Sequence, residues 1–240
     1  PGKQYLERME KDPLVIIPTG ACEVYGPHLP MGTDLLVAKR IAELVAEETD
    51  ALIAPTIEAG ESSALASFPC TFAMPRKILE DYLDYILGKV LKDGAKKILF
   101  ITGHAGNVDT VNYLSKKYME QYDFKMAQVD WWRFATVHNK GICQYDGYMC
   151  NGHASECGTS VMLYLFPELV DEAGETCVDP HTSSEFSDFI TLGNLFLSLF
   201  FSLPYLLGVN LLLQFRQIHP PLHFFFELCR SLFLLLRQLV

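Results

Sequence analysis

The sequence lacks an excess of basic residues. Its 240 residues include 19 lysines and arginines against 29 aspartates and glutamates, which gives a formal net charge of −10. Nucleic-acid binding depends on clustered cations that neutralise phosphates, and the sequence shows no basic stripe. We therefore expect no nucleic-acid partner.

The chain also lacks paired cysteine motifs. Its seven cysteines are odd in number and irregularly spaced, without a Cys-x-x-Cys pair. A disulfide framework is therefore not expected, and the reducing cytoplasm is the predicted compartment. The opening residues, Pro1-Gly2-Lys3-Gln4, lack the charge, apolar run and small-residue cleavage site of a signal peptide.

Charged residues are missing from one long stretch near the end. None occurs over residues 189–215, where leucine and phenylalanine dominate. By length this stretch meets the criterion for a membrane-spanning helix, and the alternatives are buried core elements or a tail not native to the fold. The last is favoured because the stretch breaks the alternation of everything before it. We therefore expect a domain over residues 1–182 and an atypical Leu/Phe-rich segment over residues 183–240, packed on or part of that domain, and no membrane association.

Half of all residues are apolar, which is enough for a sizeable hydrophobic core. Short apolar runs predict strands at 14–17, 51–57, 97–101 and 124–129, and helical spacing predicts helices at 34–48, from 75 onward, at 108–121 and at 159–166. The apolar stripe expected on the helix that opens at Pro75 is Ile78, Tyr82, Leu83, Ile86, Val90 and Leu91. Strand–helix alternation predicts a mainly parallel sheet with helices on both faces. In such sheets the ligand site lies at the carboxyl ends of the strands.

The first chemically informative motif is the loop from Gly20 to Asp34, directly after the first strand. It holds Glu23, His28 and Asp34 among glycines and prolines. Asp34 alone would be interpreted as a cap of the next helix. With Glu23 and His28 in the same loop, a metal-binding or acid–base role becomes the favoured interpretation.

Two further motifs follow later strands. Small residues flank His104 after the third strand, in Thr102-Gly-His-Ala-Gly-Asn107. His153 and Glu156 lie just before the last predicted helix, where they are an acid–base pair, a ligand pair or a solvated helix start. Carboxylates and imidazoles suit zinc, manganese or iron, and three such ligands leave coordination positions open. An open position activates water, so hydrolysis is the predicted chemistry.

These motifs resemble those of the creatininase (creatinine amidohydrolase) family over about residues 10–172. The similarity lies in Gly-x-x-Glu-x-x-Gly-Pro-His-Leu-Pro-x-x-Thr-Asp, Gly-His-x-Gly-Asn and His-Ala-x-Glu-x-x-Thr-Ser. The resemblance implies a three-layer α/β/α sandwich, usually oligomeric, with an often dinuclear metal centre. Glu23 and His104 match ligands of one metal, and Asp34 matches the carboxylate that bridges two.

The resemblance also implies further site residues. His28 matches a histidine near the site, and His153 matches one placed for proton transfer. Trp132 falls where family members can carry an aromatic that covers the substrate, although core or rim packing is an equal alternative. Asn107 and Gly106 complete the expected substrate-binding set.

The sequence departs from the family pattern at three candidate ligands of a second metal. Tyr25 stands where histidine is usual, Gly106 where some members have glutamate, and Gly158 where glutamate often stands. A phenol is a poor substitute for imidazole as a ligand. We therefore expect one well-held metal, with Glu156 as the fourth protein contact and Tyr25 as a hydrogen-bonding or proton-handling group.

The resulting prediction is a metal-dependent hydrolase that opens a small cyclic amide or related polar ring. Zinc is the expected metal, with manganese or iron as alternatives, and His153, Glu156, His28 and Tyr25 are the expected catalytic residues. The run Cys-Glu-Val-Tyr-Gly-Pro-His is similar to family members proposed to open cyclic diketones such as oxidised inositols, which is one alternative. The other is an inactive, ligand-binding family member. We expect a cytoplasmic homo-oligomer, for which a hexamer is one form, with a small-molecule substrate.

Overall fold

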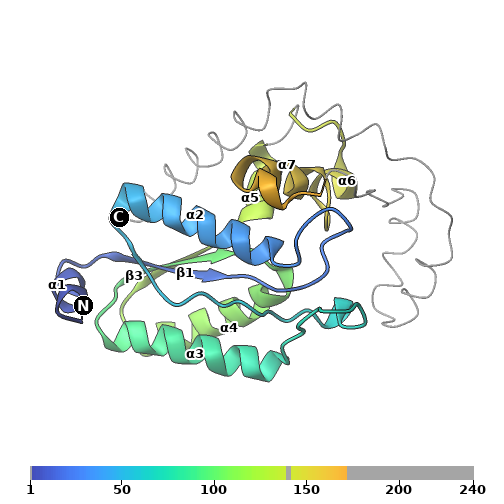
Figure 1. Cartoon of the computed structure of the whole chain (residues 1–240). Helices are drawn as coiled ribbons and strands as arrows, with labels where there is room; N and C mark the ends of the chain where they lie inside the picture. The colour runs from blue at the N-terminus through green and yellow to red at the C-terminus, as the bar shows by residue number, and fades with distance from the viewer. Residues whose placement is uncertain (1, 139–141, 172–240) are drawn as a thin grey trace, which may run out of the picture.

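A parallel four-stranded sheet forms the centre of the computed structural model, which describes residues 2–138 and 142–171 (Figure 1). The strand order is β2-β1-β3-β4. The strands are β1 (Leu14–Thr19), β2 (Leu52–Ile53), β3 (Lys97–Thr102) and β4 (Lys125–Asp130). All pairings are parallel, as the strand–helix alternation predicts.

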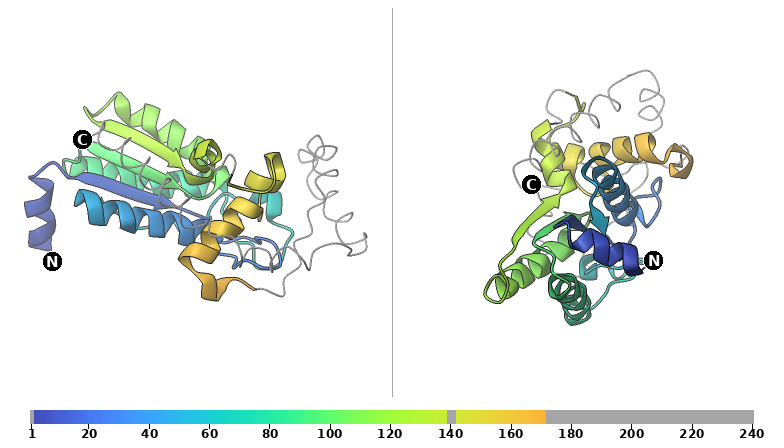
Figure 2. Two further views of the ribbon diagram at one scale, coloured as in Figure 1. Left: turned by 90° about the horizontal axis from the view of Figure 1, so that it is seen from above. Right: turned by 90° about the vertical axis from the view of Figure 1, so that its left-hand side faces the viewer.

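Helices cover both faces of the sheet. Their bounds are α1 (Gly2–Met9), α2 (Thr33–Thr49), α3 (Arg76–Lys92), α4 (Val108–Met119), α5 (Trp131–His138), α6 (Gly147–Asn151) and α7 (Glu156–Leu165), with short 3₁₀ turns at Ser63–Leu65, Ala105–Asn107 and Pro167–Leu169. Helices α2, α5 and α7 lie on one side of the sheet and α3 and α4 on the other (Figures 1 and 2). The predicted α/β/α sandwich is confirmed.

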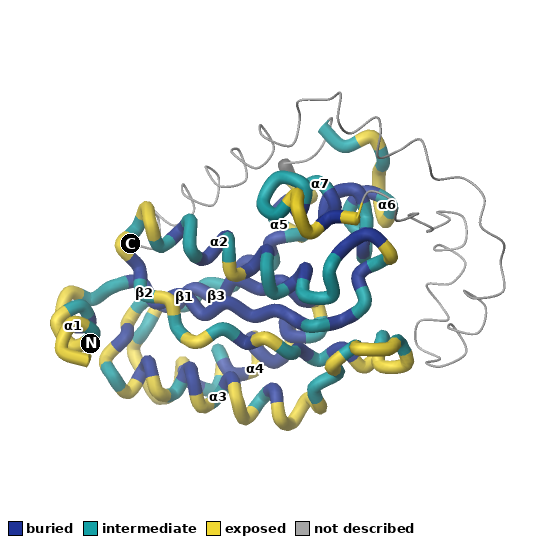
Figure 3. The backbone as a smooth tube through the Cα atoms, in the orientation of Figure 1, coloured by how far each residue is buried: buried dark blue, intermediate teal, exposed yellow. Residues whose placement is uncertain are grey.

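Alternating side chains of the strands fill two cores, one per face. Ile16 and Leu99 point into the core beneath α2, α5 and α7, whereas Ile17 and Phe100 point into the core above α3 and α4. All four are fully buried, and β1 and β3 form the dark centre of Figure 3. Because both faces are covered, the two central strands β1 and β3 are apolar over most of their length instead of alternating with polar residues.

The register of the sheet brings the ends of three strands to one level. Thr19 pairs with Thr102, and Thr102 pairs with Asp130. The segments that follow these residues therefore leave the sheet at the same edge, at the end away from α1. This edge carries the site described below.

Two details of the sequence-based prediction were wrong. The strand expected at 51–57 is regular only at Leu52–Ile53, with one further bridge from Thr19 to Ile57. Pro55 interrupts the pairing because proline has no N–H to donate. The apolar stripe predicted for α3 is wrong at two positions, because Ile78 and Tyr82 are 55% and 39% exposed. Leu79 and Leu87, which the prediction omitted, are buried, and so are the other four predicted residues: Leu83, Ile86, Val90 and Leu91.

Several boundaries differ from prediction as well. Helix α7 begins at Glu156, three residues before the expected start, and α4 ends at Met119. Helices α1, α5 and α6 were not expected; α5 begins at Trp131 directly after β4 ends at Asp130, so no turn residues mark its start. The expected segment 183–240 lies outside the described residues, as does the apolar stretch at 189–215. Within residues 2–138 and 142–171, no helix has the length and apolar character needed to cross a membrane.

Candidate metal site and its cavity

Three predicted ligands meet at the carboxyl edge of the sheet. Glu23 follows β1, Asp34 lies in the first turn of α2, and His104 follows β3. The Nδ1 atom of His104 lies 2.9 Å from Asp34 Oδ2 and 3.3 Å from Glu23 Oε1. One ligand atom from each residue lies within 4.8 Å of the others, so the three can share one ion.

Gly103 makes this approach of strand end and helix start possible. A Cβ atom at this position would lie 2.0 Å from the backbone oxygen of Asp34. Any side chain there would push α2, and with it the carboxylate of Asp34, away from His104. The glycine before the histidine is therefore a geometric requirement of the site.

A backbone contact fixes the orientation of His104. Its Nε2 atom donates a hydrogen bond to the carbonyl oxygen of Glu61 at 2.7 Å. The other ring nitrogen, Nδ1, is then left to face the two carboxylates. Metal-binding histidines use this arrangement, in which the distal N–H binds a carbonyl or carboxylate and sets the tautomer.

The electrostatics of the group favour a positive charge between the carboxylates. Burial alone would lower the pKa of His104, but the hydrogen bonds and charges of Asp34 and Glu23 outweigh it and raise the pKa to about 10. Burial would raise the pKa of Glu23, yet the hydrogen bond and charge of His104 lower it. Burial raises the pKa of Asp34.

A divalent metal ion fits these residues. Glu23, Asp34 and His104 are exposed by only 1%, 3% and 8%. Among the described residues, the Oε2 atom of Glu23 is buried without a hydrogen-bond partner. Buried carboxylate oxygens are costly unless they are paired or bind a cation. The donor set of two carboxylates and one imidazole is one that zinc and manganese accept.

A cavity of about 460 Å³ opens directly above the three ligands. Its walls come from the strand-end loops, the turn at Ser63–Leu65, the start of α5, and the region from α6 to α7. The lining includes Glu23, Asp34 and His104, and also Tyr25, Gly106, Trp131, Trp132, Tyr148, Asn151 and His153. The expected substrate-binding residues Trp132 and Gly106 thus lie on the cavity wall.

His153 and Tyr25 form one side of the cavity. Their ring centroids are 4.2 Å apart. The Nε2 atom of His153 donates to the carbonyl oxygen of Val24 at 2.6 Å, and its Nδ1 atom lies 3.7 Å from Glu23 Oε1. Burial raises the pKa of Tyr25 well above its usual value, and the charges of Asp34 and Glu23 add to this effect, so Tyr25 is a neutral phenol.

His28 lies outside the cavity, although it was expected near the metal. It is 1% exposed, and its Nε2 atom lies 2.7 Å from the hydroxyl of Thr159. That hydroxyl donates its one proton to the carbonyl oxygen of Ser155, so Nε2 is the donor to Thr159. Burial lowers the pKa of His28 to about 4, which keeps the imidazole neutral. The hydrogen bond from His28 to Thr159 therefore connects the first motif to α7.

Glu156 was expected as a metal contact and Asn107 in substrate binding, but both side chains are hydrogen-bonded to backbone groups instead. The two carboxylate oxygens of Glu156 accept hydrogen bonds from the backbone N–H groups of Gln144 and Tyr145, at 2.8 and 2.9 Å. Asn107 donates to the carbonyl oxygen of Gly20 and accepts from the N–H of Glu61. Neither side chain lines the cavity. Asn107 connects the loop after β1 to the segment after β2, and Glu156 binds the loop before α6.

Other cavity residues were not expected from the sequence. Ser62 and Leu65 belong to the segment after β2, and Tyr148 and Asn151 belong to α6. The hydroxyl of Ser62 lies 3.4 Å from the Nε2 atom of His104. Neither segment carries a motif that would have identified these residues from the sequence.

A parallel α/β/α sandwich with a buried carboxylate–imidazole group at its carboxyl edge defines an α/β protein with a divalent-metal site. The family model described as creatinine amidohydrolase matches residues 2–202, and the chain therefore belongs to the creatininase family. The match runs beyond residue 182, where the change in composition had suggested a boundary.

Curated relatives carry three different activities in their names. The mycofactocin precursor peptide peptidase of Mycolicibacterium smegmatis is 30% identical over 169 residues, 67% of this chain and 62% of its own length. The creatinine amidohydrolase of Pseudomonas putida is 28% identical, covering 70% and 71%. The 3-dehydro-scyllo-inosose hydrolase of Thermotoga maritima is 26% identical, covering 74% and 58%. The chain thus spans less than two thirds of the peptidase and of the inosose hydrolase.

Solved creatininase structures share the fold. A crystal structure of creatininase aligns with a TM-score of 0.67 at 25% identity, and covers 75% of each chain. Similar solved creatininases include a manganese form and a zinc form. These structures support a divalent metal as the ion that the three ligands would hold.

Proposed function

We propose that this chain is a divalent-metal-dependent hydrolase of a small polar ring or amide. The observation that carries the proposal is the convergence of Glu23, Asp34 and His104 beneath a cavity of about 460 Å³. Cavities of this size suit small ligands. A divalent ion in such a place polarises a carbonyl oxygen and activates water for attack.

The chain's own residues supply the remaining chemistry. The Nδ1 atom of His153 faces Glu23 because its Nε2 proton is bound to Val24, so Nδ1 can accept a proton from the attacking water and return it to the leaving group. Tyr25, a neutral phenol at the same wall, can donate a hydrogen bond to the substrate or to a carboxylate. Trp132 lines the cavity, where its aromatic ring can pack against a bound substrate.

We propose further that the site of Glu23, Asp34 and His104 holds one ion. The position of Gly106 has no room for a ligand side chain, because a Cβ there would lie 2.0 Å from the backbone oxygen of Glu61. The ring of Tyr25 faces Gly158, with a Cβ at that glycine 3.5 Å from it. Tyr25 therefore fills the space next to Gly158, the position at which family members often have glutamate. Two tightly bound ions at the three-ligand site would contradict this proposal.

A cyclic ketone is the second candidate substrate. Tyr25 stands where the family pattern has histidine, and its phenol is a hydrogen-bond donor beside the carboxylates. Such a donor can stabilise the oxyanion that forms when water attacks a ring ketone. The inosose hydrolase of Thermotoga maritima is a relative with a substrate of that kind in its name. In this reaction a C–C bond breaks instead of the C–N bond of a cyclic amide.

A metal-exchange assay with a substrate panel tests the proposal. Purified full chain is stripped of metal, loaded separately with Zn²⁺, Mn²⁺ or Fe²⁺, and given creatinine, an oxidised inositol and a short peptide. We expect metal-dependent ring opening of one cyclic substrate, and its loss in Glu23→Gln and His104→Asn. Bound metal without turnover of any substrate would favour the inactive, ligand-binding alternative.

The subunit state and compartment are part of the same proposal. We expect a homo-oligomer, with a hexamer as one form, working in the cytoplasm on a small molecule. Light scattering coupled to size-exclusion chromatography measures the subunit number directly. A monomer at micromolar concentration would refute this part.

A further inference from the structure

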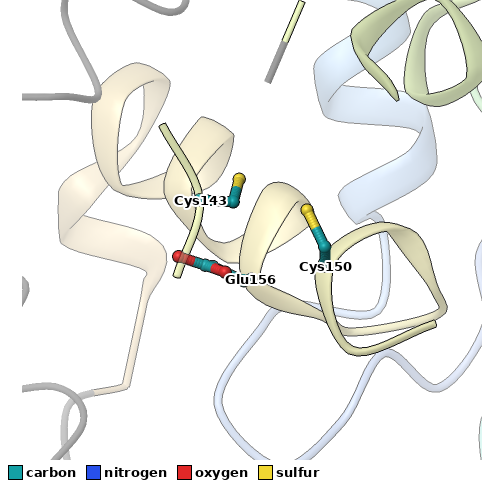
Figure 4. Close-up of side chains that lie close together, drawn as sticks. All are labelled: Cys143, Cys150 and Glu156. Atoms are coloured by element: carbon teal, nitrogen blue, oxygen red, sulfur yellow. The ribbon is translucent and has the colours of Figure 1, made fainter. Parts of the chain in front are cut away.

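A second group of potential ligands lies behind the cavity wall. Cys143 and Cys150 come together with Glu156, with their ligand atoms within 4.8 Å of one another. Figure 4 shows that the three side chains come from three segments: the loop before α6, helix α6, and the first turn of α7. None of the three lines the cavity, so this group is separate from the site of Glu23, Asp34 and His104.

We infer that Cys143, Cys150 and Glu156 form a binding site for a thiophilic divalent cation, of which Zn²⁺ is the best match. Two sulfurs and one carboxylate oxygen are a ligand set that zinc accepts, with a fourth position left for water. Bond lengths in tetrahedral zinc sites place such ligand atoms roughly 3.6–3.8 Å apart. No two of these ligand atoms are more than 4.8 Å apart, so the cluster would contract by roughly 1 Å at most to reach this geometry.

The surroundings of the cluster hold the ligands in place. Both oxygens of Glu156 accept backbone N–H groups, from Gln144 and Tyr145, which fixes the carboxylate and leaves further lone pairs for an ion. The side chain of Asn151 hydrogen-bonds Cys150, and the two thiols hydrogen-bond each other. Such contacts orient metal ligands in known sites. Cys150 and Glu156 are also buried, at 2% and 8% exposure.

An ion here would have a structural task. The segment from Cys143 to Asn151 carries Tyr148 and Asn151, which line the cavity, and α7 carries Gly158 on the same wall. An ion that joins Cys143, Cys150 and the start of α7 would close this short segment against the helix. The inference does not depend on the proposed hydrolase activity, because it concerns how the wall is held and not what the cavity binds.

Cobalt spectroscopy separates the two sites. Co²⁺ bound to thiolates gives an intense ultraviolet charge-transfer band, whereas oxygen and nitrogen ligands do not. The reduced, metal-free full chain is titrated with Co²⁺ alone, and we expect the band to saturate at one ion per chain. His104→Asn should keep the band although it removes the other site, so failure of one proposal leaves the other intact.

Cysteine variants locate the site. The double variant Cys143→Ser/Cys150→Ser should lose the band, and the matched control Cys70→Ser, an exposed thiol outside the cluster, should keep it. X-ray absorption of the zinc-loaded His104→Asn protein should show sulfur neighbours, which tests the site without changing a cysteine. A titration without a thiolate band, a band retained by the double variant, or a Cys143–Cys150 disulfide in freshly purified protein would each overturn the inference.

Discussion

His28 should make the folded state sensitive to mild acid. In the fold, burial lowers the pKa of its imidazole to about 4 from 6.5, although the charge of Asp171 acts in the opposite direction. The Nε2 proton is donated to Thr159, and among the described residues the Nδ1 atom is buried without a partner. Protonation would therefore create a buried N–H without an acceptor, whereas in the unfolded chain the same proton is bound freely.

The sign and size of the effect follow from the two pKa values. At pH values between these two pKa values, the unfolded chain binds more protons than the folded chain. The contribution of His28 to stability is therefore fully present above about pH 6.5 and falls as the pH drops toward 4. The difference, 6.5 minus about 4, corresponds to about 3 kcal/mol at most. At pH 4.5 roughly 2–3 kcal/mol of the free energy of unfolding should be lost through this residue.

A comparison with His28→Gln isolates this contribution from the carboxylates, which titrate in the same range. Urea unfolding of both proteins, followed by tryptophan fluorescence between pH 4.5 and 7.5, gives the two free energies at each pH. The variant should be less stable than wild type at pH 7.5, because it loses packing and the contact to Thr159, and should recover about 2–3 kcal/mol relative to wild type at pH 4.5. Parallel pH profiles for the two proteins would refute the argument.

Four further substitutions test the fold and the site. Leu79→Ala should cost about 2–5 kcal/mol of unfolding free energy because the residue is fully buried, whereas Ile78→Ala should stay within about 0.5 kcal/mol; equal losses in urea titrations would mean that α3 is rotated. Gly103→Ala should destabilise the chain and weaken metal binding together, since its Cβ meets the backbone of Asp34 at 2.0 Å; unchanged zinc affinity by calorimetry would contradict the close approach. His153→Gln should lower kcat by about 10²–10⁴ with the metal content unchanged, and a normal kcat would remove the residue from proton transfer.

The three-ligand site was predictable because its parts obey a topological rule. In a parallel sheet with level strand ends, the residues after each strand must emerge at one edge, so Glu23 and His104 come together wherever their strands pair as neighbours. Asp34 follows because α2 begins where the first loop ends. Local patterns, with apolar runs for strands and glycine-rich loops behind them, were enough to locate this edge.

The direction of individual side chains was decided only by tertiary packing. Helical spacing could not tell whether Ile78 or Leu79 of α3 faces the sheet, because both fit an apolar stripe and one step of 100° separates them. His28 was expected near the metal, yet the turn of its loop directs it to Thr159 behind the cavity wall. Glu156 likewise faces the backbone of the preceding loop.

The sequence alone therefore determined the family, the layer architecture and which three polar residues would meet at the sheet edge, since these depend on motifs and on periodicities that one strand or helix carries within itself. Tertiary structure decided which remaining polar residues reach the cavity, and brought Cys143, Cys150 and Glu156 into one cluster. Their irregular spacing carries no motif, and they meet because a loop and two helices fold against one another. Proximity of this kind is a property of packing, which no single stretch of sequence encodes.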